Sequence, residues 1–62
     1  MKLVIGKLIQ EKGLKITYVA DKLGVNRRTV SNWIDGMTDP PFFMMVKLAK
    51  LLDVSLYDLF EE

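Results

Sequence analysis

The sequence predicts a small all-α domain of five helices, two of which form a helix-turn-helix. Apolar residues recur at three- and four-residue intervals in successive segments, as they do along one face of a helix. Glycine or proline interrupts this pattern after each of the first three segments and marks the helix ends there. No segment shows a strand pattern, and neither repeats nor low-complexity stretches occur. The chain is therefore expected to form a single domain, residues 1–62.

Length and composition restrict both the source of stability and the chemistry open to the chain. A chain of 62 residues buries only about 60% of the surface that its unfolded form exposes. Cysteine and histidine are both absent, so stability must come from packing, and the usual general base and commonest metal ligand are missing. We therefore expect no enzymatic activity, no cofactor and no metal site.

The hydropathy pattern gives no sign of a membrane protein. The longest apolar runs are far shorter than the roughly 20 residues of a membrane-spanning helix. The N-terminus lacks the pattern of a signal peptide. We expect a cytoplasmic protein that binds neither membrane nor small-molecule substrate.

Charge is distributed unevenly along the chain, although the formal sum is only +1. Residues 1–36 contain seven cations and three acids, a net charge of +4, whereas residues 37–62 contain two cations and five acids, a net charge of −3. The strongly basic sum typical of nucleic-acid binding is missing. The basic and acidic ends nevertheless form a dipole that could orient the domain toward a phosphate backbone.

The first helix is predicted over about residues 2–12. Its apolar residues recur at helical spacing, namely Val4, Ile5, Leu8 and Ile9. Gly13 ends it, because glycine adopts the left-handed conformation of many helix ends without steric cost.

The second and third helices make up the predicted helix-turn-helix, residues 16–36. The second helix runs from Ile16 to Leu23, and Lys15 and Thr17 are both candidates for its N-cap. Gly24 permits the positive φ angle of an abrupt turn. The third helix then begins after its N-cap, Asn26.

The third helix has a buried face and a cationic face. Val30 and Trp33 share the inner face, so we expect Trp33 in the core rather than stacked on a ligand. Arg27 and Arg28 lie in its first turn, and Gly36 ends it. On the preceding helix, Tyr18 takes an outer position, where it could bond a phosphate or simply cover the surface.

The fourth helix is predicted from Pro41 to Leu52, with the proline in the first helical position. One apolar face is expected from Phe42, Met45, Val46, Ala49 and Leu52. Phe43, Met44, Leu48 and Leu51 add more apolar surface than one buried face needs. The fifth helix is predicted after the N-cap Ser55 and through Phe60, and Glu61 and Glu62 form a solvated tail.

The chain resembles the lambda-repressor-like, or Cro/Xre, helix-turn-helix domains of bacteria and phages. The resemblance rests on KGL at residues 12–14, VADKLGVNRRTVSNWIDG at residues 19–36, the proline before the fourth helix and KLAKLLDVSLYDLF at residues 47–60. It covers nearly the whole chain. It implies a sequence-specific DNA-binding transcriptional regulator, expected to be a repressor or Cro-like protein that binds a pseudo-palindromic operator in double-stranded DNA as a homodimer.

The same resemblance implies which residues contact DNA. In this family the third helix lies in the major groove, and its base-contacting positions fall here on Arg27, Arg28 and Asn32. Backbone contacts are expected from Lys15, Thr17, Asn26, Thr29 and Ser31. The alternative is that the two arginines are merely solvated. Arginine in a first turn opposes the helix dipole, and that small cost favours a contact.

Three departures from the family pattern affect these expectations. Ile16 stands where the family usually presents a polar residue to a phosphate, and the loop at residues 37–39 lacks the usual cations, so we expect modest affinity with a shallow salt dependence. Ile9 and Ile34 stand where the family often has a partly buried arginine and glutamate. Because packed aliphatic residues can replace such an ion pair, we expect these two to touch.

The third and last group of implied residues concerns the partner subunit. Phe43 and Met44 occupy positions that are usually polar in the family. A subunit contact is expected to use Phe43, Met44, Val54, Leu56, Tyr57 and Phe60, with filling of a small core as the alternative.

The rival function is a protein-interaction module, such as an anti-repressor or antitoxin subunit, which the low net charge, Ile16 and the acidic loop favour.

Overall fold

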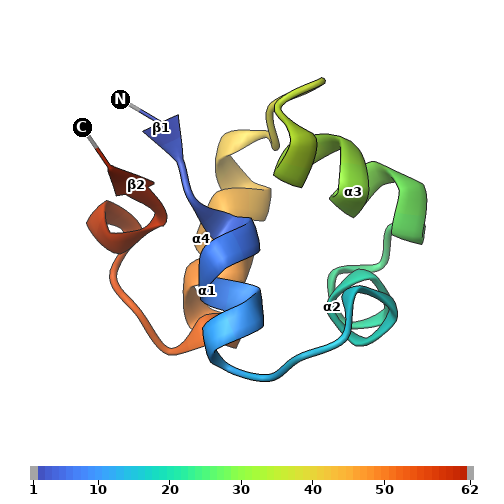
Figure 1. The fold of residues 1–62 in the computed structure, drawn as a ribbon, viewed down its shortest axis with the longest axis horizontal. Helices are drawn as coiled ribbons and strands as arrows, with labels where there is room; N and C mark the ends of the chain where they lie inside the picture. The colour runs from blue at the N-terminus through green and yellow to red at the C-terminus, as the bar shows by residue number, and fades with distance from the viewer. Residues whose placement is uncertain (1, 62) are drawn as a thin grey trace.

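A computed structural model describes residues 2–61 of the chain (Figure 1). These residues fold around one apolar core. Four α-helices follow one another: α1 (Ile5–Glu11), α2 (Ile16–Leu23), α3 (Arg27–Asp35) and α4 (Phe42–Leu52). A 3-10 helix, η1 (Leu56–Leu59), and two short strands, β1 (Lys2–Leu3) and β2 (Phe60–Glu61), complete the fold. The predicted fold class is confirmed, with the fifth helix reduced to a single 3-10 turn. Within the described residues, none of the helices is long and apolar enough to span a membrane.

Two unpredicted strands join the ends of the described chain. They pair antiparallel, with Lys2 opposite Glu61, and the Val4 N–H donates to the Leu59 carbonyl at 2.8 Å. The first helix therefore begins at Ile5 rather than at residue 2. A pairing of two residues per strand is too short to produce a detectable alternation, so no sequence pattern announces it.

Glu61 thus belongs to a strand rather than to a free tail, while Glu62 lies outside the described residues. The Glu61 carboxylate lies 3.9 Å from the Lys7 ammonium. Both side chains are more than half exposed, so this pair contributes little to stability.

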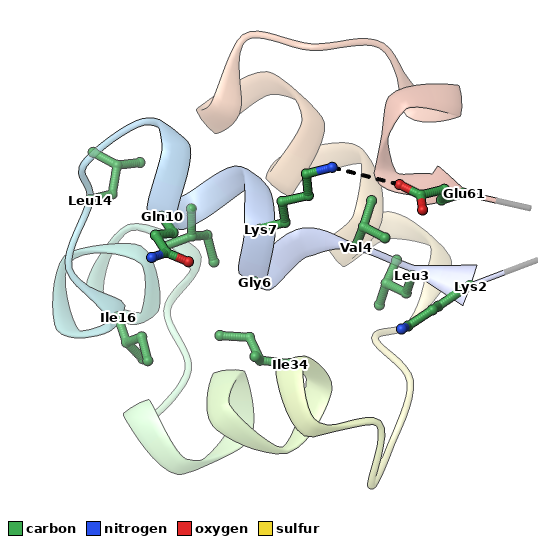
Figure 2. Close-up of a pocket in the computed structure, with 11 residues that line it drawn as sticks. Lys2, Leu3, Val4, Gly6, Lys7, Gln10, Leu14, Ile16, Ile34 and Glu61 are labelled. Carbon is green, nitrogen blue, oxygen red and sulfur yellow. Dashed lines mark ion pairs between the residues drawn. The ribbon is translucent and has the colours of Figure 1, made fainter.

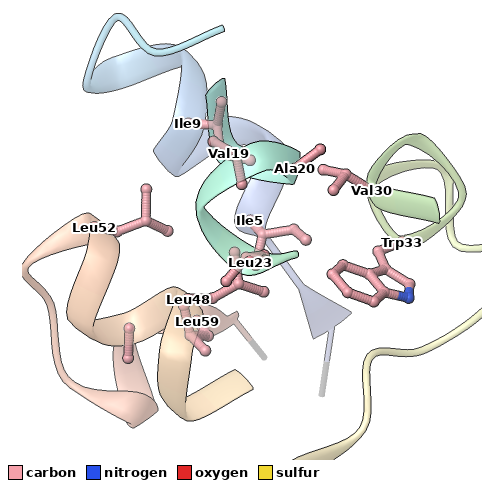
Figure 3. Close-up of a cluster of buried hydrophobic side chains, with 11 residues drawn as sticks. Ile5, Ile9, Val19, Ala20, Leu23, Val30, Trp33, Leu48, Leu52 and Leu59 are labelled. Atoms are coloured by element: carbon pink, nitrogen blue, oxygen red, sulfur yellow. The ribbon is translucent and has the colours of Figure 1, made fainter. Parts of the chain in front are cut away.

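The core receives apolar side chains from every α-helix and from η1 (Figure 3). Its most deeply buried large members are Ile5, Val19, Val30, Leu48, Leu52 and Leu59. Trp33 is 5% exposed, which confirms its predicted place in the core. In Figure 3 its side chain extends from α3 at the edge of the cluster, and with Val30 it holds α3 on the core.

Helix α4 keeps most of its predicted inward face, since Ala49 and Leu52 are buried and Met45 packs against the core, but it differs from the prediction at two positions. Phe42, expected to face inward, is 65% exposed, whereas Leu48, expected to be surplus, is completely buried. The buried stripe of α4 consists of Leu48, Ala49 and Leu52. Since nine of its eleven residues are apolar, periodicity alone could not identify the inward face. Pro41 is the N-cap residue, one position before its predicted place.

Helices α1 and α3 approach each other closely at Gly6. A Cβ atom built on Gly6 would lie 2.7 Å from Cγ2 of Ile34, so glycine is required for this approach. Ile9 and Ile34 line the same recess of about 630 Å³ between the two helices (Figure 2). Ile9 and Ile34 therefore lie at one helix crossing, where the tight contact of Ile34 is with Gly6, and direct contact between the two isoleucines stays a prediction.

We expect Gly6→Ala to destabilise the domain, although alanine is ordinarily the better helix former. The added methyl overlaps Cγ2 of Ile34, and a β-branched side chain cannot rotate that atom away freely. Such overpacking costs about 1–3 kcal/mol, measurable by urea unfolding. Ile34→Ala in the same chain removes the overlap, so the double variant should lose less stability than the sum of the two single changes. An increase in melting temperature for Gly6→Ala alone would contradict the close approach.

Candidate nucleic-acid interface

Helix α3 presents its polar side chains on the face opposite the core. Val30 is completely buried, whereas Arg27 and Arg28 are exposed and Asn32 is half-buried. Arg28 and Asn32 are four residues apart, so their side chains lie one turn apart on the same face. Arg27 lies about 100° around the helix from Arg28. The structure therefore brings two of the three predicted base-contacting residues into one outward row.

The helix-turn-helix geometry follows from its two glycine caps. Gly24 and Gly36 end α2 and α3 with φ angles of 74° and 79°, in the left-handed region. Past the first cap, the Val25 N–H donates to the Ala20 carbonyl at 3.1 Å, so the chain turns at once into α3. Both helix boundaries in this motif match the prediction.

Asn26 caps α3 and is tied to Thr29. The Asn26 Oδ1 accepts the Thr29 backbone N–H at 2.8 Å and the Thr29 hydroxyl at 2.9 Å. The single hydroxyl proton of Thr29 is thus already donated, so it cannot also be given to a phosphate while the cap is intact. Asn26 keeps its Nδ2 amide as a donor. Asn26 and Thr29 are two of the five predicted backbone contacts, and of this pair only Asn26 keeps a free donor group while the cap is intact.

The start of α2 provides a second group of polar residues. Of the two candidates for the N-cap of α2, Lys15 and not Thr17 occupies that position. Its backbone is extended, and its side chain makes no capping hydrogen bond. Thr17 is exposed in the first turn. Ile16 is half-buried and lines the α1–α3 recess together with Gln10 (Figure 2). Gln10 was not predicted as a site residue, because in the sequence it is one exposed polar residue of the first helix.

Tyr18, left open by the sequence, lies on the outer side of α2. Its side chain is 43% exposed. The Lys22 ammonium lies 5.6 Å from the centroid of its ring, within the range of a cation–π contact. The ring face is thus partly occupied by a neighbour on the same helix, while both side chains stay at the surface.

The six residues predicted at a subunit contact do not share one environment. Phe43 and Tyr57 are 59% and 88% exposed. The other four are half-buried and pack against the domain's own core: Met44, Val54, Leu56 and Phe60. Met37 and Phe42, absent from the prediction, are 74% and 65% exposed. Together with Phe43 they form what we call the α3–α4 apolar segment.

Comparison with known proteins identifies the motif independently. A family model described as helix-turn-helix matches residues 5–59, from the first residue of α1 to the last of η1. No curated protein sequence matches the chain.

Solved structures from three bacteria share the fold. A Bacteroides fragilis protein provisionally described as DNA-binding has a TM-score of 0.90 and 29% identity, covering 94% of each chain. A Listeria innocua transcriptional regulator has a TM-score of 0.83 and 28% identity, over 100% of this chain and 64% of that one. The N-terminal DNA-binding domain of SinR from Bacillus subtilis has a TM-score of 0.76 and 29% identity, over 94% of this chain and 86% of that domain.

We expect Asn26→Ala to lower the free energy of unfolding by about 0.5–2 kcal/mol, because the cap of α3 is lost. Asn26→Ser keeps a capping oxygen and should retain most of the stability, but it removes the Nδ2 donor. Urea unfolding measures the first effect, and titration with duplex DNA measures the second. Unchanged unfolding of Asn26→Ala would show that the cap contributes nothing, and wild-type DNA affinity of Asn26→Ser would limit Asn26 to capping.

Proposed function

Because this chain belongs to the lambda-repressor-like, or Cro/Xre, family of helix-turn-helix DNA-binding domains, we propose that it represses transcription by occupying a pseudo-palindromic operator. The family is one of DNA-binding transcriptional regulators. The observation that carries the proposal is the outward row of Arg28 and Asn32 on α3, opposite the buried Val30. Bound RNA polymerase and a bound domain of this size cannot share one stretch of DNA, so occupancy itself excludes transcription.

In this proposal α3 enters the major groove with its N-terminal half. The guanidinium groups of Arg27 and Arg28 donate in pairs to guanine O6 and N7, and the Asn32 amide pairs with adenine N6 and N7. Each such pair supplies about 1–3 kcal/mol of discrimination against the wrong base. The exposed arginines have the length to reach base edges, while the shorter Asn32 requires α3 to lie close to the groove floor.

Backbone contacts fix the register of α3 on the duplex. Lys15 and Thr17 at the start of α2, together with Ser31 on α3, are suited to meet phosphates on the two sides of the groove. Asn26 contributes its Nδ2 donor, and Thr29 contributes by holding the Asn26 side chain in place. These contacts are few and the loop after α3 carries Asp39, which supports a modest affinity and a shallow salt dependence.

A second copy of the chain completes the proposed complex. Two-fold symmetry places the two α3 helices about 34–36 Å apart on successive turns of the same DNA face. Among the predicted contact residues, the exposed Phe43 and Tyr57 are available to touch a partner directly, while the remaining four are half-buried and pack against the core of their own domain. Met37 and Phe42, close to Phe43 in the sequence, are exposed apolar residues as well.

A protein-interaction module is the competing function. The α3–α4 apolar segment favours it, because three large apolar side chains are exposed within residues 37–43 and would suit another protein as well as a second copy. The formal charge of only +1 also favours it.

Arg28→Ala distinguishes the two functions. We expect selection from a random-sequence duplex pool at low salt to enrich a consensus, and Arg28→Ala to weaken binding to that site by about 1–3 kcal/mol and to relax specificity at one base pair. Lys50→Ala on α4, an exposed cation outside the proposed interface, is the control for lost charge. No enrichment at any salt concentration, or unchanged binding of Arg28→Ala, would favour the interaction module.

Sedimentation velocity tests the second copy. We expect two chains per pseudo-palindromic duplex, with Phe43→Ser and Tyr57→Ser each weakening the cooperative step by roughly tenfold, as truncation of an interface aromatic does. Both side chains are more than half exposed, so neither change empties the core. A strict monomer at high protein concentration, with one chain per duplex, would remove the proposed interface.

A further inference from the structure

Helix α3 carries its charges in the sense opposite to its own dipole. Arg27 and Arg28 lie in its first turn, where the exposed N–H groups favour acids, and Asp35 is its last residue, where the exposed carbonyls favour cations. Helices α2 and α4 instead each have a lysine in the last turn. Both ends of α3 therefore carry charges that weaken this helix, which points to a role for them outside its own stability.

Asp35 lies in the outward row of α3. It follows Arg28 by seven residues, close to two full turns, so the two side chains lie on nearly the same face about 10.5 Å apart along the axis. Both are exposed. Among residues 2–61, Asp35 forms no ion pair with a lysine or arginine, so its charge is not neutralised within the described chain. The outward row is thus cationic at its N-terminal end and anionic at its C-terminal end.

Because of this charge distribution, the electrostatic energy of binding depends on the angle between α3 and the DNA. When the N-terminal half enters the major groove, the arginines approach the bases and phosphates while Asp35 stands back from the duplex. When the helix instead lies flat along the backbone, as in sequence-independent binding, the carboxylate approaches phosphates and is repelled. The repulsion between Asp35 and the phosphates therefore weakens mainly sequence-independent binding.

We propose that Asp35 is a specificity-determining residue, whose carboxylate weakens sequence-independent binding by repelling backbone phosphates. The proposal rests on the proposed function of α3 in DNA binding. It concerns a residue that makes no favourable contact to DNA and acts by excluding the wrong arrangements, as selective interfaces often do.

The test compares Asp35→Asn with a matched control, Asp53→Asn. Asp53 is the C-cap of α4, in the left-handed conformation that asparagine also adopts, and in Figure 1 this end of α4 lies on the side of the molecule away from α3. Both variants remove one acid from a helix C-terminal end, so both should raise the melting temperature through the helix dipole. Only Asp35→Asn should alter binding to DNA.

Affinities are measured for a site selected from a random pool and for a random-sequence duplex, over a range of salt concentrations. Asp35→Asn should tighten binding to the random duplex roughly threefold or more at low salt and steepen its log–log salt slope by up to about 0.9, with a smaller gain on the selected site. The ratio of the two affinities therefore falls. Asp35→Glu keeps the charge and should resemble the wild type.

Three results would overturn the proposal. Random-duplex affinity could be unchanged in Asp35→Asn, it could rise equally in Asp53→Asn, or selected-site affinity could fall in Asp35→Asn, as expected if the carboxylate accepted a cytosine N4 hydrogen bond. Failure of the wild type to bind any duplex would instead refute the proposed function itself, and the two failures are thus distinguishable.

Discussion

Burial of Val30 and Trp33 against the core is the constraint on which the rest of the candidate interface depends. These two side chains fix the rotation of α3 about its own axis, and the rotation decides which side chains face outward. Arg28, Asn32 and Asp35 face outward for that reason alone. The chemistry of the surface is therefore set from inside the domain, and polar substitutions at outward positions can change what is bound without changing the fold.

Two further contacts, one near each end of α3, fix the position of this helix in the domain. Close contact of Ile34 with Gly6 sets the distance between α3 and α1, and the Asn26–Thr29 cap sets where the helix begins. The rotation of α3 about its axis, its first residue and its distance from α1 are thus all fixed, so its outward side chains have little positional freedom. Such preorganisation matters for the proposed complex, in which few backbone contacts are expected, because little binding energy is then lost in ordering the interface.

The helix-turn-helix was predictable from sequence because its signals are local. Gly24, Asn26 and Gly36 each act through the backbone within a few residues, so the boundaries of α2 and α3 could be predicted from nearest neighbours. The inward position of Trp33 followed from its spacing to Val30 for the same reason. The family model that matches residues 5–59 agrees with the resemblance drawn from these residues.

What the sequence could not predict depends on contacts between distant segments. Strand β1 exists only because β2 lies beside it, and neither has a pattern of its own. The inward face of α4 was ambiguous because nearly every residue of that helix is apolar, and the tight contact of Ile34 with Gly6 required the geometry of a helix crossing. At the interface, local periodicity could not show that the Thr29 hydroxyl is already engaged by Asn26.

The pairing of β1 with β2 has a consequence for how the domain opens. It rests on very few hydrogen bonds at the ends of the described chain, and the buried Ile5 and Leu59 next to the strands hold those ends together without it. A short, exposed pairing of this kind is expected to fray long before the core unfolds, in a local opening of low free energy. Neither α2 nor α3 contributes to it, so amide hydrogen exchange at the strands can be fast while the helix-turn-helix stays protected.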